Sequence, residues 1–138
     1  MITEILPTVF AIRWSSKWAG DVPGPRTVRA YLDLAFAQAD PKLGKETYDG
    51  VSARTEGSYD LVELSPSKRL QTLHAQGARF GITGDNQAGA WFGETPVASA
   101  YEGDDHGFGE WNWKREEYIY IEALWAAKNP KGWAKIYA

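Results

Sequence analysis

The sequence predicts a single α+β domain spanning residues 1–138, in which a mostly antiparallel sheet of about five to six strands packs against two helices. Three observations support this class. The order along the chain is strand, helix, strand, helix and then a run of strands. A chain of 138 residues with 43% apolar residues can bury a core of its own. Seven tryptophans, seven tyrosines and five phenylalanines supply large side chains for that core.

Alternating apolar residues predict the first strand over residues 8–14. A helix is predicted over residues 25–39, because Pro25 suits the first helical position and apolar residues then recur at helical spacing. Pro41 disfavours helical backbone at the residue before it, so the helix ends there. Residues 41–58 show no period and are predicted to form a long connection.

The second helix, over residues 66–76, has clear signals at both ends and follows a short strand over residues 59–64. Ser65 is the predicted N-cap and Pro66 the first helical residue. Gly77 is the predicted C′ glycine, which accepts the left-handed backbone that ends many helices.

Glycine-rich turns mark the next strands. Residues 78–83 and 89–93 are predicted to form a β-hairpin around a loop that is longer than the tight two-residue type. Residues 95–101 are predicted to add another strand, with Pro96 at its start or on an edge.

The C-terminal stretch is predicted to form a β-hairpin. Its long strand covers residues 113–127, because the Tyr-Ile-Tyr-Ile run at 118–121 is aromatic and β-branched. Pro130 and Gly132 then provide a turn into a short terminal strand. The alternative is a helix, since the glutamates and alanines of the same stretch are good helix formers.

Charge is distributed unevenly along the chain. The segment from Phe80 to Trp113, called here the acidic window, holds six acidic residues and no Lys or Arg, whereas the remainder has fifteen basic residues against twelve acidic ones. Carboxylates set among large aromatic side chains are typical of a surface that binds a basic protein partner. The predicted binding residues are Trp91, Glu102, Asp104, Asp105, Phe108, Glu110, Trp111 and Trp113.

A second hypothesis is a pocket for a small, anionic ligand. Arginines in the first turn of the predicted helix 25–39 are unfavourable next to the helix dipole, which suggests a role in holding an anion. Aromatic residues from the preceding strand and loop would supply the pocket walls. The predicted pocket residues are Arg13, Trp14, Trp18, Arg26 and Arg29.

Catalytic and cofactor motifs are absent from the sequence. It has no cysteine, no Gly-x-Ser-x-Gly elbow and no phosphate-binding glycine loop, so we predict no cofactor and no metal site. Asp104, Asp105 and His106 are adjacent in one loop and cannot readily converge on one ion. A small carboxylate-dependent hydrolase, using an acid near His106, is the third hypothesis.

The net charge of −3 argues against direct binding of nucleic acid. No apolar stretch reaches membrane-spanning length and no signal peptide is evident, so we expect a cytoplasmic location and no membrane partner. A free sheet edge would allow a homo-oligomer. The composition is typical of small phage or bacterial accessory proteins, such as immunity proteins and inhibitors of host defence. The sequence therefore favours a non-enzymatic binding or inhibitor protein.

Overall fold

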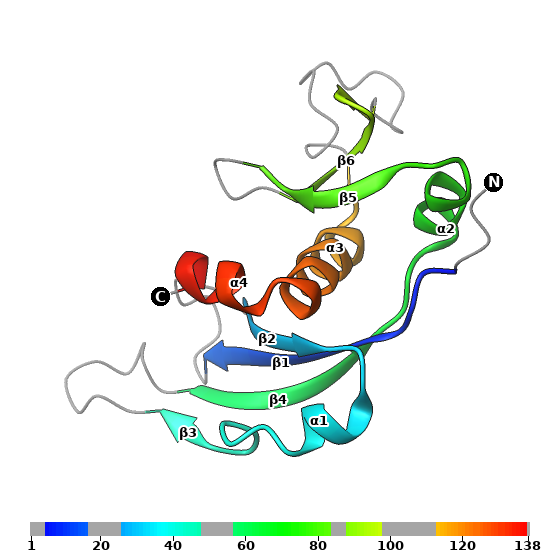
Figure 1. Cartoon of the computed structure of the whole chain (residues 1–138). Helices are drawn as coiled ribbons and strands as arrows, with labels where there is room; N and C mark the ends of the chain where they lie inside the picture. The colour runs from blue at the N-terminus through cyan, green and yellow to red at the C-terminus, as the bar shows by residue number, and fades with distance from the viewer. Residues whose placement is uncertain (1–4, 17–25, 48–56, 84–87, 98–112, 138) are drawn as a thin grey trace.

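The computed structural model describes residues 5–16, 26–47, 57–83, 88–97 and 113–137 (Figure 1). It has an α+β architecture built from two antiparallel sheets and four helices within these ranges. The described elements are β1 Val9–Ser16, β2 Arg26–Tyr31, α1 Leu34–Gln38, β3 Glu46–Thr47, β4 Gly57–Leu64, α2 Lys68–Ala75, β5 Arg79–Ile82, β6 Ala88–Phe92, β7 Thr95–Pro96, α3 Arg115–Lys128 and α4 Pro130–Tyr137. None of the described helices is both long and apolar enough to cross a membrane.

The larger sheet has the strand order β2-β1-β4-β3. The predicted first strand is confirmed as β1, and the strand predicted at 59–64 is confirmed as β4. These two strands pair along their whole length, from Val9 opposite Leu64 to Ser16 opposite Gly57. Alternate residues of β1 serve two cores, because successive side chains of a strand point to opposite faces. Ala11 packs in the cluster that contains α3, whereas Ile12 packs in a smaller cluster with Tyr59.

Strands β5, β6 and β7 form a separate sheet. The hairpin predicted at 78–83 and 89–93 is confirmed, with Gly81 opposite Gly89. A Cβ at Gly89 would lie 2.9 Å from the ring of Trp91, so glycine is required for this close packing. The strand predicted at 95–101 is described only as Thr95–Pro96 in β7 and Val97 after it. The prediction of one sheet of five to six strands is wrong, because α3 lies between the two sheets (Figure 1).

The predicted C-terminal β-hairpin is also wrong, since residues 115–137 form the helices α3 and α4. Helix α3 contacts β1 and β2 on one side and β5 and β6 on the other. Tyr120, Ile121 and Leu124 are buried within it, and the Tyr120 hydroxyl donates to the Pro7 carbonyl at 2.5 Å. A helix buried between two sheets has large apolar side chains on several of its sides. Its sequence therefore lacks the amphipathic period by which surface helices are recognised.

The helix predicted over 25–39 is replaced by β2 and the short helix α1. Pairing with β1 places Ala30 opposite Ala11 and Tyr31 opposite Phe10. This non-local pairing outweighs the helical spacing of the apolar residues. Asp33 is the N-cap of α1, and its carboxylate accepts from the Ala35 amide at 2.8 Å. Helix α1 lies on the side of the larger sheet opposite α3 (Figure 1).

Helix α2 confirms the second predicted helix but begins later. Ser67, rather than Ser65, is its N-cap and accepts from the Leu70 amide at 3.1 Å. Gly77 adopts a φ of +98° at the C-terminal end, as predicted. The choice of Ser67 follows from tertiary structure, because its hydroxyl also donates to Glu117 of α3 at 2.7 Å.

Candidate functional site

A groove of about 240 Å³ runs beside β2, between this strand and the helices α3 and α4. We call it the β2 groove. It is lined by Val28, Arg29, Ala30, Tyr31, Lys42, Ala126, Pro130, Trp133 and Ala134. Four of these residues are consecutive in β2, which is one of the two edge strands of its sheet in the described part of the chain. The groove therefore lies along part of this edge strand, where Val28 and Ala30 are buried and Arg29 is exposed.

Asp40 organises the polar side of the β2 groove. Its side chain is fully buried, and its carboxylate accepts from the Tyr31 hydroxyl at 2.6 Å and from the Lys42 amide at 2.8 Å. The Arg29 guanidinium lies 3.5 Å from the same carboxylate. Burial of the Tyr31 hydroxyl, together with its hydrogen bond to Asp40, raises the pKa of this tyrosine. Tyr31 thus remains a protonated donor at neutral pH, and Asp40 fixes three residues that line the groove.

The β2 groove has a positively charged rim. The Arg29 side chain keeps 46% of its surface exposed despite its ion pair. Lys42 places its ammonium group 5.2 Å from the centre of the Tyr59 ring, a cation–π distance. The Asp40 carboxylate pairs with the Arg29 guanidinium and accepts from the backbone amide of Lys42.

The apolar wall of the β2 groove is anchored to the strand. The Trp133 indole donates to the backbone carbonyl of Thr27 at 3.0 Å, and its ring meets Trp125 edge-on at 6.4 Å. A Cβ at Gly132 would lie 2.7 Å from the Trp125 ring, so the close approach of α4 to α3 depends on this glycine. The backbone of β2 at Thr27 therefore accepts a hydrogen bond from a side chain of α4.

The structure brings together only part of the ligand pocket predicted from the sequence. Arg29 lines the β2 groove. Arg26 lies 5.2 Å over the ring of Trp14, which is 5% exposed in the smaller core. Arg13 lies on the face of the sheet opposite to that of Trp14, and its guanidinium donates to the Thr27 hydroxyl at 2.9 Å. Trp18 lies outside the described residues.

Most of the predicted partner-binding surface also lies outside the described residues, namely Glu102, Asp104, Asp105, Phe108, Glu110 and Trp111. Trp91 is half-buried on β6, with the Arg79 guanidinium 4.8 Å over its ring. Trp113 is only 7% exposed and packs in the main core, with the Arg69 guanidinium 4.6 Å over its ring. Trp113 thus gives most of its surface to the core.

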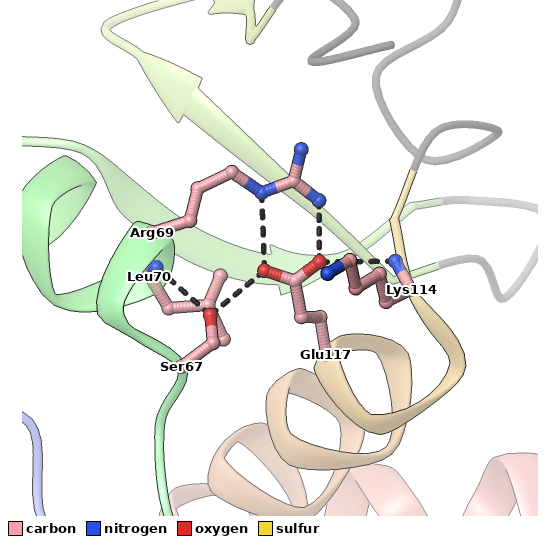
Figure 2. A network of polar contacts seen from close by, with 5 residues as sticks. All are labelled: Ser67, Arg69, Leu70, Lys114 and Glu117. Carbon is pink, nitrogen blue, oxygen red and sulfur yellow. Dashed lines mark hydrogen bonds and ion pairs between the residues drawn. The ribbon is translucent and has the colours of Figure 1, made fainter.

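A second buried carboxylate joins the starts of α2 and α3 (Figure 2). Glu117 is 2% exposed and accepts from the Ser67 hydroxyl, the Arg69 guanidinium and the Lys114 amide. Burial alone would raise its pKa, but the hydrogen bonds from Arg69, Lys114 and Ser67 together lower the pKa below the ordinary value. These hydrogen bonds therefore stabilise the ionised carboxylate of Glu117.

Glu122, also on α3, has a different environment. Burial raises the pKa of its carboxyl group, and the positive charge of Arg13 opposes this effect only in part. Glu117, by contrast, is held by the hydrogen bonds that join α2 to α3. In the described ranges, no group of three side chains that could ligate a metal occurs.

A second pocket, of about 320 Å³, lies between α2, β5 and the end of α3, and His74 lines it. The His74 ring stacks on Phe80 at 6.3 Å. Its Nε2 atom has no hydrogen-bond partner in the described structure, but neighbouring atoms cover it. This polar atom does not reach the pocket surface, but Arg79, Lys128 and Asn129 also line the pocket.

Sequence reasoning missed Asp40, Lys42 and Trp133, because they were assigned to a helix end, a loop and a terminal strand. The available signal was the Thr-Val pair at 27–28, whose β-branched side chains favour a strand over a helix. Searches of protein-family models, curated proteins and solved structures find no match to this chain.

Proposed function

We propose that this chain is a non-enzymatic binding protein whose β2 groove takes an anionic ligand that also has an apolar part. The observation that carries this proposal is the arrangement around Asp40. A fully buried carboxylate holds Arg29 in place and leaves almost half of its side chain exposed at the groove rim. Lys42 also lines the groove, with its ammonium group over the Tyr59 ring.

The chemistry of the β2 groove favours a carboxylate group on the ligand. The planar guanidinium of Arg29 matches the geometry of a carboxylate, and Lys42 adds a point charge. Ala126, Pro130 and Trp133 offer an apolar wall opposite these charges. A volume of about 240 Å³ suits one aromatic ring or one branched aliphatic group at a time.

The test uses phenylacetate and its uncharged analogue phenylacetamide as probes of the full chain. We expect phenylacetate to shift the NMR signal of the Trp133 indole N–H and phenylacetamide to bind more weakly. Added salt should reduce the difference, because exposed charges are screened. Lys42→Gln should weaken phenylacetate binding about two- to fivefold, the effect of an exposed charge pair of about 0.5–1 kcal/mol.

Lys45→Gln is the matched control, since Lys45 is exposed three residues away and does not line the groove. An equal loss of affinity in the two variants would indicate non-specific attraction to positive charge. Absence of any shift at Trp133 with millimolar phenylacetate would contradict the proposal.

A second candidate function rests on the acidic window, with six acidic residues and no Lys or Arg between Phe80 and Trp113. This charge favours an inhibitor or immunity protein that covers a basic surface of a protein partner. Charge reversal at Asp104 and Asp105 should weaken capture of that partner and flatten its salt dependence. Unchanged binding by the reversed variant would remove this candidate. Hydrolysis by a carboxylate and His106 remains the third hypothesis, and survival of any such activity in His106→Ala would dismiss it.

A further inference from the structure

We infer that helix α4 is a hinged lid of the β2 groove, which rotates open about Asn129 to admit the ligand and closes over it. This inference rests on the proposed function, because the lid and the ligand share one groove. Helix α4 follows α3 and packs against β2 and α3 (Figure 1). Three of the residues that line the groove belong to α4, namely Pro130, Trp133 and Ala134. Opening of α4 therefore removes one wall of the groove.

A single side chain holds α4 in the closed position. Within residues 130–135, Trp133 is the one buried residue, at 7% exposed. Its ring meets Trp125 edge-on, and its indole N–H donates to the Thr27 carbonyl at 3.0 Å. Segments with few buried side chains open locally at a lower free energy than the core does. We therefore expect α4 to open while α3 stays folded.

The joint between α3 and α4 permits this movement. Asn129 is the one residue between the two helices. Its N–H donates to the Trp125 carbonyl at 2.8 Å, and its own carbonyl accepts from the Trp133 N–H at 2.9 Å. Pro130 has no N–H and cannot extend the hydrogen-bond ladder of α3. Rotation about the Cα–C bond of Asn129 therefore moves α4 as a unit and keeps both hydrogen bonds.

A ligand in the β2 groove favours the closed lid. Trp133 and Ala134 contribute to the groove wall only when α4 is closed. A ligand that contacts this wall binds the closed state more tightly than the open one, and it shifts the population by that difference in affinity.

Native-state hydrogen exchange of the isotope-labelled full chain tests for local opening. We expect the amides of α4 to exchange at least tenfold faster than those of residues 120–124 in α3. The α4 rates should not change with low concentrations of urea, because a local opening exposes little surface, whereas the α3 rates should rise. Equal rates with equal urea dependence in the two helices would overturn the lid.

Two matched variants sharpen this test, since each removes one hydrogen-bond donor and keeps an aromatic ring. Tyr120→Phe removes the donor to the Pro7 carbonyl, a bond that stays intact when α4 alone opens. It should speed exchange in α3 roughly two- to tenfold, the effect of one lost hydrogen bond, and leave α4 unchanged. Trp133→Phe removes the donor to Thr27 and should speed exchange in both helices. If Tyr120→Phe speeds α4 as much as α3, then α4 opens only with the whole chain and is not a lid.

Phenylacetate connects the lid to the groove. At ten times its dissociation constant it should slow exchange in α4 about tenfold, because the ligand must leave before α4 opens. If phenylacetate shifts the Trp133 indole signal without slowing α4, the lid is overturned and the proposed function stands. If phenylacetate does not bind, the proposed function fails, and the lid stands or falls by the effect of Tyr120→Phe on the free chain.

Discussion

Asp40 and Glu117 are both buried carboxylates that bind an arginine, but the two arginines end in different surroundings. Arg69, the partner of Glu117, is covered by the Trp113 ring and keeps 27% of its side chain exposed. Arg29, the partner of Asp40, keeps 46% exposed at the rim of the β2 groove. Glu117 thus uses its cation to join two helices, whereas Asp40 leaves its cation almost half exposed at the rim of the groove.

The comparison teaches that burial of a carboxylate does not by itself define a functional site. Glu117 accepts hydrogen bonds from Ser67 and Arg69 at the start of α2 and from the Lys114 amide before α3, so its charge is neutralised inside the protein (Figure 2). Asp40 accepts from a tyrosine hydroxyl and one amide, and the remaining interaction is a longer contact with an exposed guanidinium. The second arrangement leaves its cation the more exposed of the two.

The largest expected effect is that of Glu117→Ala. The change leaves Arg69 without its carboxylate and Ser67 without its acceptor, so it should lower the free energy of unfolding by about 3 kcal/mol, as for a broken buried ion pair. Urea denaturation measures this loss. Glu116→Ala, at an exposed neighbour, is the control and should stay within about 0.5 kcal/mol. Similar losses in both variants would show that the Glu117 network does not hold α2 and α3 together.

Asp40→Asn should have an intermediate effect. Asparagine keeps an acceptor oxygen for the Lys42 amide, but it places an NH₂ donor at the position of the second oxygen, which contacts the Arg29 guanidinium and accepts from the Tyr31 hydroxyl. We expect a loss of about 1–2 kcal/mol in the free energy of unfolding, measured in the same way.

The matched control for this change is Asp33→Asn, because asparagine and aspartate serve equally well as N-caps. If Asp40→Asn costs as much as Glu117→Ala, the two carboxylates are equally structural. The proposed division of roles between them would then be incorrect.

The smallest expected effect concerns acid pH. The folded-state pKa of Glu117 is lowered, so its stabilising contribution is present above the ordinary glutamate value of 4.5 and is lost as pH falls through the folded-state pKa. The stability difference between the wild-type chain and Glu117→Gln should therefore be constant above about pH 5.5 and should shrink below pH 4.5. Chemical denaturation across this range measures it. A difference that does not change with pH would mean that the charge of Glu117 is not what Arg69 and Ser67 bind.

Local sequence determined several elements of this protein. The alternation of β1 and β4, the ends of α2 at Gly77 and the glycine hairpin of β5 and β6 depend on interactions between near neighbours in the chain. The α+β class follows from their order. The acidic window is likewise a property of composition, and no contact is needed to recognise it.

Tertiary structure decided the remaining elements. In residues 26–31 the apolar residues have helical spacing, but Thr and Val favour a strand. Pairing with β1 selected the strand. Residues 115–128 contain strand-like Tyr-Ile pairs among good helix formers, and packing between two sheets selected the helix. Intrinsic propensities differ by only about 1 kcal/mol per residue, so burial against distant elements outweighs them.

The candidate site was beyond the reach of local patterns for the same reason. Its strand and its helical wall are about a hundred residues apart in the chain, and Asp40 gains its role only when the fold brings Tyr31 and Arg29 to it. The sequence identified Arg29 as a candidate anion-binding residue because a cation at a helix start is unfavourable. That helix does not exist, and the exposed position of Arg29 follows from the sheet edge, which only the folded chain defines.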